Sequence, residues 1–129
     1  MKLIGIIPFL LTLTVGQFAH AETFTCVFTE PWVTLTYSTS SKILVSSNSS
    51  LAPEEKYALK RVSVRESQPG IILWFKANGE QIARLELTRH GTDGMSETIY
   101  PYDIKTTIVK YSSGIGGCYT SLLGPKIAQ

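Results

Sequence analysis

The chain has 129 residues, of which 43% are hydrophobic, and its 12 basic and 10 acidic side chains give a net charge of +2 at pH 7. These charges are scattered, so the composition excludes the basic stripe that nucleic-acid-binding proteins carry. The length suffices for one domain that buries about two-thirds of its unfolded surface, which is a modest core.

The first 21 residues have the parts of a secretory signal peptide. A basic residue follows the initiating methionine, Leu3–Val15 is an apolar run, and residues 19–21 read Ala-His-Ala, a small-x-small cleavage site. The run is shorter than the roughly 20 residues of a membrane span, so we expect no stable membrane anchor. The residues before Cys26 do not form a lipidation signal. We therefore predict a cleaved signal peptide over residues 1–21 and a secreted or periplasmic bacterial protein that begins at Glu22.

The two cysteines, Cys26 and Cys118, lie near the two ends of the mature domain. Thiols pair in oxidising compartments, so we predict one disulfide between them; the alternative is two buried free thiols. Two cysteines and one mature histidine fall short of the four ligands of a typical zinc site. We therefore expect no metal and no cofactor.

Residues 22–39 alternate between apolar and polar side chains, which is the period of half-buried strands. Glu30 and Pro31 interrupt the alternation, because proline cannot donate to a strand ladder. We therefore predict two strands joined by a tight corner. The predicted inward residues are Phe24, Cys26, Phe28, Val33, Leu35 and Tyr37.

The next segments have weaker patterns. Residues 42–46 form a short β-rich piece, and residues 46–50 form a serine-rich loop. In residues 57–66, Val62 and Val64 alternate with polar side chains, which predicts a single strand.

Residues 70–87 contain the strongest local signal, because two apolar runs flank Asn78-Gly79. This dipeptide is preferred in two-residue hairpin turns, which need positive φ at both positions. We therefore predict a hairpin in which Ala77 pairs with Glu80.

Continuing that register along the hairpin defines two faces. Trp74 then stands opposite Ala83, and the predicted core face consists of Ile72, Trp74, Ala83, Leu85 and Leu87. The other face, with Ile71, Leu73 and Phe75, is more apolar than a solvated face should be. Either a loop covers it or it is a contact surface.

The remaining chain reads as a loop over 88–95, a long strand over 98–111, a turn or bulge over 112–117, a short strand over 118–122 and a flexible tail over 124–129. Short strands at this spacing, without an amphipathic helix, predict an all-β fold. A disulfide between the first and last strands would place them side by side. We therefore predict a small antiparallel β-barrel of seven or eight strands over residues 22–123.

Catalytic chemistry has little support in the sequence. His90 is the only histidine of the mature chain, and a disulfide leaves no thiol nucleophile. Asp93 and Glu97 could form a carboxylate pair, but an Asx-type turn with a solvated glutamate fits their interval better. We therefore predict no catalytic residue and a protein that is not an enzyme.

A ligand mouth or rim could be formed by Glu30, Trp32, Tyr100 and Tyr102. Aromatic side chains combine contact area with a polar tip, which suits such a position. The alternative, which we favour, is that these residues serve as core and rim packing.

Short motifs extend across the mature chain, with Glu-Pro-Trp at 30–32, Asp-Gly-Met-Ser at 93–96, Tyr-Pro-Tyr at 100–102 and Gly-Cys at 117–118. They resemble those of a group of small exported bacterial proteins of unassigned function. That group has an early Glu-Pro-Phe-Trp type motif and a late Asp-x-Met-Ser, Tyr-Pro-Tyr and Gly-Cys run. The resemblance covers nearly the whole mature chain and implies export.

A second resemblance lies in the central hairpin. Leu-Trp-Phe-Lys at 73–76, with Glu80 and Leu-Glu at 85–86 between the two cysteines, is similar to the hairpin of the C-type lysozyme inhibitors of bacterial envelopes. Those are small β-barrels in which a loop serine and a lysine near the hairpin enter the lysozyme cleft. The resemblance implies that Lys76 and Ser67 are the partner-binding residues.

The function predicted from these features is a non-enzymatic protein-binding module, monomeric or weakly associating, with c-type lysozyme as the candidate partner. Two alternatives stay open. One is a lipocalin-like binder of a small apolar ligand within the barrel. The other is a structural cell-envelope protein.

Overall fold

The computed structural model describes residues 5, 21–29, 32–50, 53–109 and 114–127, and their regular secondary structure is all β-strand. The signal peptide predicted for residues 1–21 lies outside these ranges except for residues 5 and 21. Within the described ranges, no helix is long and apolar enough to cross a membrane.

Within the described residues, ten strands form one antiparallel sheet, which is more than the seven or eight predicted. The hydrogen-bonded order is β4-β3-β2-β1-β9-β8-β7-β6-β5, and β10 pairs with β8. The strands are β1 (Thr23–Phe28), β2 (Val33–Ser38), β3 (Ile43–Asn48), β4 (Glu55–Leu59), β5 (Ser63–Gln68), β6 (Ile72–Ala77), β7 (Glu80–Gly91), β8 (Thr98–Thr106), β9 (Ile115–Thr120) and β10 (Lys126–Ile127).

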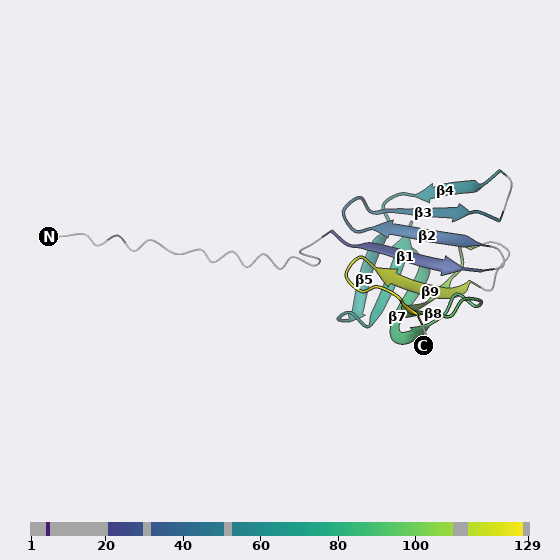
Figure 1. The fold of residues 1–129 in the computed structure, drawn as a ribbon. Helices are drawn as coiled ribbons and strands as arrows, with labels where there is room; N and C mark the ends of the chain where they lie inside the picture. Colours follow the sequence, from purple (N-terminus) through teal and green to yellow (C-terminus); the bar gives the residue numbers. More distant parts are fainter. Residues whose placement is uncertain (1–4, 6–20, 30–31, 51–52, 110–113, 128–129) are drawn as a thin grey trace.

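The sheet folds over so that its two halves face each other, with β1 to β4 and β9 in front of β5 to β7 (Figure 1). Aromatic rings from both halves meet in the core. The ring centroid of Phe75 on β6 lies 5.7 Å from that of Phe24 on β1 and 5.1 Å from that of Tyr37 on β2. The all-β antiparallel class is thus confirmed. Strand pairing among the described residues ends at β4 and β5, so it does not close the sheet into the predicted barrel.

The single strand predicted over residues 57–66 is wrong, because it is divided into β4 and β5 at opposite ends of the sheet order. Arg61 has a φ of 62°, in the left-handed region that ends an extended run. The next residue, Val62, is fully buried; its N–H donates to the Lys42 carbonyl, and its carbonyl accepts from the Tyr37 hydroxyl. The chain therefore passes from one half of the sheet to the other at this point.

Residues 107–109 connect the two halves where strand pairing does not. The N–H of Thr107 donates to the carbonyl of Ile82 on β7, and the hydroxyl of Tyr57 on β4 donates to the carbonyl of Ile108 at 2.7 Å. Val109 is buried beside them. A loop segment rather than a ladder thus links β7 with the edge strand β4.

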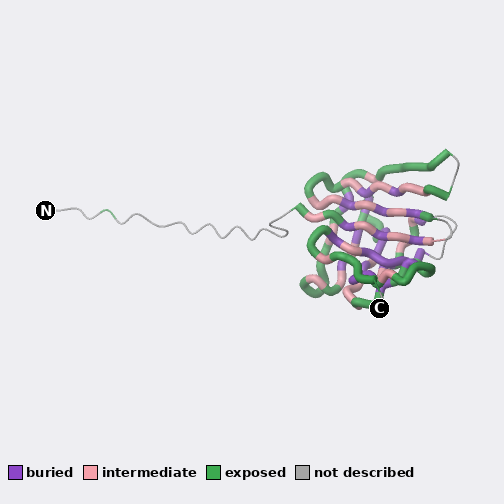
Figure 2. Tube along the Cα trace, viewed as in Figure 1, coloured by how far each residue is buried: buried purple, intermediate pink, exposed green. Residues whose placement is uncertain are grey.

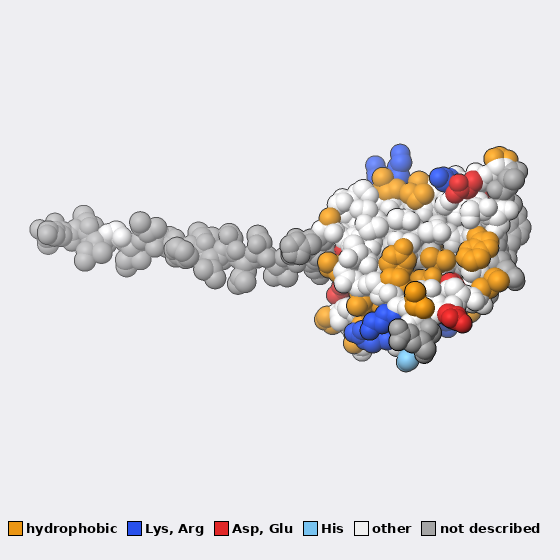
Figure 3. Space-filling view, viewed as in Figure 1, with side chains coloured by type: hydrophobic (Ala, Val, Ile, Leu, Met, Phe, Trp, Pro, Cys, Tyr) orange, Lys and Arg blue, Asp and Glu red, His pale blue; other side chains and the backbone are white. Residues whose placement is uncertain are grey.

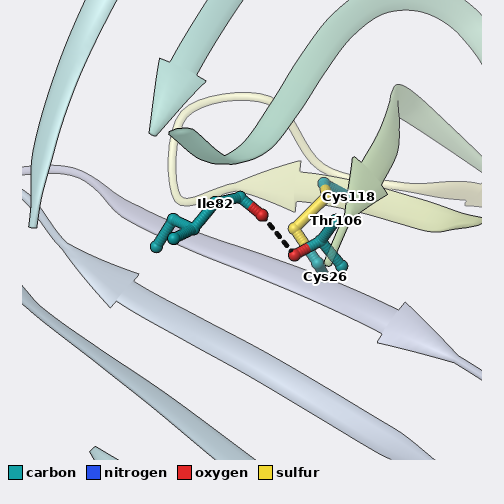
Figure 4. Close-up of a disulfide and its surroundings, with 4 residues drawn as sticks. All are labelled: Cys26, Ile82, Thr106 and Cys118. Atoms are coloured by element: carbon teal, nitrogen blue, oxygen red, sulfur yellow. Dashed lines mark hydrogen bonds between the residues drawn. A yellow bond between two sulfur atoms is a disulfide. The ribbon is translucent and has the colours of Figure 1, made fainter. Parts of the chain in front are cut away.

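The predicted disulfide is confirmed. Cys26 on β1 and Cys118 on β9 are direct partners in the ladder, and their sulfurs are bonded (Figure 4). Both residues are buried, and the bond between their sulfurs excludes the alternative of two buried free thiols. The bond joins positions 92 residues apart and fastens the first strand to the ninth.

The turn of the central hairpin is confirmed, but its predicted register is not. Asn78 and Gly79 have φ values of 52° and 79°, and Ala77 pairs with Glu80. The register then shifts, because Ile82 is an extra residue on β7. Its carbonyl accepts a hydrogen bond from the Thr106 hydroxyl at 2.6 Å (Figure 4), so the bulged backbone is satisfied by the end of β8.

This bulge reverses the two faces of β6. Phe75 now stands opposite Ala83, and Trp74 stands opposite Arg84. Leu73 and Phe75 are buried, whereas Trp74 and Ile72 are half-exposed on the outside. The core face predicted for β6 is therefore wrong, and the unusually apolar alternative face is the core.

Burial alternates along β1, β2 and most of β3 in the front half, as Figure 2 shows, whereas the edge strand β4 is almost entirely exposed. The six inward residues predicted there are all buried, namely Phe24, Cys26, Phe28, Val33, Leu35 and Tyr37. Alternation with one apolar face is the expected pattern for a sheet that is solvated on one side only.

Four boundaries in the last third differ from the prediction. The strand predicted over 98–111 ends at Thr106, and residues 107–109 do not continue it. Residues 88–91 belong to β7 rather than to a loop, and β9 already begins at Ile115. The expected flexible tail contains β10, in which Lys126 pairs with Ile99 and Ile127 with Thr98 on β8. The ends of these strands and the pairing of the tail depend on partner strands that are distant in sequence.

Candidate functional site

Of the four residues predicted for a ligand mouth, the structure describes Trp32, Tyr100 and Tyr102. Glu30 lies outside the described residues, and Trp32 is 49% exposed. Tyr102 is buried in the central core, its ring centroid 6.4 Å from that of Phe24, and burial raises the pKa of its hydroxyl. Tyr100 is also buried, but in a separate cluster. The packing alternative therefore describes the two tyrosines.

Between the two halves of the sheet, the described core residues leave little space. The cavity lined by Phe24, Tyr37, Phe75, Leu85 and Ile104, among other apolar residues, has a volume of about 10 Å³. That is the space of about one water molecule. A lipocalin-like ligand would not fit in this cavity.

The motif residues of the last third form a hydrogen-bonded group around Asp93, which is 5% exposed. Its Oδ1 accepts from the N–H groups of Met95 and Ser96 at 2.9 and 2.8 Å, which confirms the predicted Asx-type turn. Its Oδ2 accepts from the hydroxyls of Ser96 and Tyr100 at 2.5 and 3.1 Å. Burial alone would raise the pKa of Asp93, but these hydrogen bonds together hold the pKa below its ordinary value.

Tyr100, which lies on β8, attaches this hydrogen-bonded group to the sheet. Its ring stacks on Tyr119 at a centroid distance of 6.2 Å, and a Cβ at Gly117 would lie 2.4 Å from the ring. Burial, with the hydrogen bond to Asp93, raises the pKa of Tyr100 to about 12. Thr29 also joins this group, because its hydroxyl donates to the backbone carbonyl of Asp93 at 2.6 Å. We call Thr29, Asp93, Ser96, Tyr100, Gly117 and Tyr119 the Asp93 cluster; its arrangement indicates a structural clamp rather than a reactive centre.

The two residues predicted to bind a partner are both exposed, but the structure does not bring them together. Lys76 pairs with Ser63 at one end of β5, and Ser67 lies four residues further along that strand. At about 3.3 Å per residue, their backbones are roughly 13 Å apart. Ser67 instead accepts a hydrogen bond from the indole N–H of Trp74 at 2.5 Å.

The outer face of β5 to β8 carries a row of side chains that crosses four neighbouring strands. Arg65 pairs with Trp74, Trp74 with Arg84, and Arg84 with Lys105. We call these four residues the Trp74 row. Arg65 and Arg84 flank the half-exposed indole of Trp74, and Lys105 lies beyond Arg84.

The centre of the Trp74 row is held in one arrangement. The guanidinium carbon of Arg84 lies 5.3 Å from the centroid of the Trp74 ring, a cation–π contact. The same guanidinium forms a 3.0 Å ion pair with Glu86, and Ser67 holds the indole from the other side. Two long side chains are thereby ordered on an open surface.

Beside this row lies a depression of about 340 Å³, lined by Arg84, Glu86, Asp103, Ile104, Lys105 and Ile115. Arg84 pairs with Lys105 in one cross-strand row, and Glu86 pairs with Asp103 in the next. Ile115, which is 54% exposed, adds an apolar wall. The depression can therefore take a side chain that carries a charge and some apolar surface.

The sequence did not reveal this row, because the expected register placed Trp74 in the core. A signal did exist in the residues: Leu73 and Phe75 make the opposite face of β6 more apolar than a solvated face should be, whereas the face of Trp74 continues into the charged Lys76. Among the described residues, no group of three or more His, Cys, Asp or Glu side chains could hold a metal ion.

Comparison of the chain with protein-family models, with curated protein sequences and with solved structures finds no match.

Proposed function

We propose that the mature chain is a non-enzymatic binding module, exported to the periplasm or beyond, whose Trp74 row binds acidic side chains of a partner protein. The observation that carries this proposal is the ordered pair of Trp74 and Arg84 on a solvent-facing sheet. The disulfide between Cys26 and Cys118 is consistent with an oxidising compartment.

The chemistry of the row suits an interface. Tryptophan and arginine are the residues most enriched among those that dominate binding energy at protein interfaces. Arg84 and Trp74 already contact each other, so binding would freeze little further side-chain motion. Arg65 and Lys105 extend the positive charge to either side.

A c-type lysozyme is the partner that we propose to test first. Its cleft contains two acidic catalytic residues, which cationic side chains of an inhibitor could pair with. Lys76 is exposed on the same outer face as Trp74, two residues further along β6. Ser67 would then act by positioning Trp74 and not by entering the cleft, because its hydroxyl is held by the indole.

The test measures inhibition of a c-type lysozyme by the purified, disulfide-bonded mature protein. We expect inhibition at micromolar concentrations of the protein. Arg84→Glu should weaken this inhibition roughly thirtyfold, which is the usual effect of replacing a residue at the centre of an interface. Lys76→Glu should also weaken inhibition. Lys56→Glu on the distant strand β4 is the matched control and should leave inhibition unchanged.

Two results would contradict the proposal at different levels. No inhibition by the wild-type protein excludes lysozyme as the partner. Inhibition that persists in both Arg84→Glu and Trp74→Ala excludes the Trp74 row as the binding surface.

A further inference from the structure

Pro101 disturbs the pairing between β7 and β8. Leu87 pairs with Tyr102 and Gly91 with Tyr100, so the three residues 88–90 of β7 stand against the single residue Pro101. Proline has no N–H to donate to a ladder, which explains why regular pairing stops there. The extra residues of β7 form a bulge.

The bulge forces an unusual conformation on Arg89. Its φ is 61°, in the left-handed region that L-residues other than Asn, Asp and Gly rarely adopt. Bulges of this kind redirect a side chain, and such backbone outliers occur at functional sites more often than elsewhere. Arg89 thereby lines a small pocket with Ile99, Pro101 and Leu123.

A second cation reaches the same pocket from the opposite side of β8. Lys126 lies on β10, which pairs with Ile99, and it also lines the pocket. Basic side chains gather on this side of the molecule near the point where the chain ends (Figure 3). The pocket has a volume of about 70 Å³, and none of the described residues that line it is acidic.

These two cations have no salt-bridge or hydrogen-bond partner for their side chains among the described residues. Like charges that converge on one small pocket repel each other, and an anion between them removes that repulsion. The planar guanidinium of Arg89 fits phosphate oxygens in pairs, and the ammonium of Lys126 adds a point charge. Ile99, Pro101 and Leu123 form apolar walls of the pocket.

We propose that Arg89 and Lys126 form a binding site for a phosphate group. One water molecule needs a volume of about 10–15 Å³. A pocket of about 70 Å³ therefore holds one small oxyanion and not a bulky ligand. The rest of a larger phosphorylated ligand would extend into solvent. The phosphate could be free or carried by a lipid headgroup, since both present the same oxygens.

The first experiment titrates inorganic phosphate into the disulfide-bonded mature protein at low ionic strength and follows backbone amide NMR signals. We expect saturable shifts near residues 99–101 and 123–126. Arg89→Asn and Lys126→Gln should each weaken the affinity at least tenfold, the effect of one charge-assisted hydrogen bond. Asparagine tolerates positive φ, so the bulge is retained.

Arg61→Asn is the matched control, because Arg61 is also exposed and has a φ of 62° but does not line this pocket. Trp74→Ala tests independence from the proposed protein-binding surface, and both variants should bind phosphate like the wild type. The absence of saturation, or saturation that survives in Arg89→Asn and Lys126→Gln, would overturn the site.

The second experiment separates the two sources of phosphate by sedimentation with vesicles. Co-sedimentation with phosphatidylglycerol vesicles that is lost in Arg89→Asn assigns a lipid phosphate. Binding of inorganic phosphate without such co-sedimentation assigns a soluble phosphate. Co-sedimentation that Arg89→Asn does not reduce contradicts a role of this pocket at a lipid surface.

Discussion

Replacement of Asp93 tests whether the motif residues of the last third act as a structural clamp. Asp93→Ala removes an acceptor of four hydrogen bonds and leaves the buried Tyr100 hydroxyl without one of its partners. A hydrogen bond to a charged group contributes about 1.5–3 kcal/mol, and an unsatisfied buried group costs about 1–3 kcal/mol. Bonds within one cluster are not additive, so we expect the free energy of unfolding to fall by roughly 3–5 kcal/mol.

The same residue predicts a direction for the pH dependence of stability. The folded protein holds the pKa of Asp93 below the ordinary value of 3.8. The stability that its charge contributes is therefore fully present above pH 3.8 and is lost as the pH falls through the lower folded pKa. Asp93→Asn keeps an acceptor for the turn but no charge. Its stability deficit relative to the wild type should accordingly shrink in acid.

The assay is urea unfolding followed by tryptophan fluorescence, at pH 7 and at acid pH, for the wild type and both Asp93 variants. Glu97→Gln is the control, because Glu97 is an exposed carboxylate of the same loop. If Asp93→Ala destabilises the protein no more than Glu97→Gln does, the clamp is not a stabilising element. A deficit of Asp93→Asn that grows in acid would contradict the charge argument.

Two further predictions concern the disulfide and the hairpin register. The double variant Cys26→Ala/Cys118→Ala should lose up to about 4.6 kcal/mol by the chain-entropy model for a 92-residue separation, measured by urea unfolding. An unchanged midpoint would show that the bond is energetically neutral. Phe75→Ala should lose about 3–5 kcal/mol because Phe75 is 3% exposed in the core. Trp74→Ala on the outer face should lose much less stability than Phe75→Ala, as measured by thermal unfolding. A larger loss for Trp74→Ala would instead support the hairpin register expected from the sequence alone.

Short-range patterns in the sequence were sufficient for several features. The Asn78-Gly79 turn and the Asx turn at Asp93 follow from residues within a few positions of each other. The alternation in residues 22–39 identified the inward side chains of β1 and β2, because a strand has a period of two whatever its partner is. The disulfide followed from there being only two cysteines in a chain that was predicted to be exported.

The candidate binding surfaces could not be obtained in this way. The Trp74 row depends on the bulge at Ile82, whose carbonyl is satisfied by Thr106 on another strand. The pocket of Arg89 and Lys126 depends on the pairing of β10 with β8. Each needs a partner that is distant in sequence.

The sequence by itself thus determined the all-β class, the turns, the inward faces of the first strands and the cysteine pair. The tertiary structure alone decided the register of β6 against β7, the break at Arg61 and the ends of the sheet. The physical reason is that one residue inserted into a strand exchanges its two faces. Whether that insertion is stable depends on hydrogen bonds and burial supplied by other strands, which local patterns do not contain.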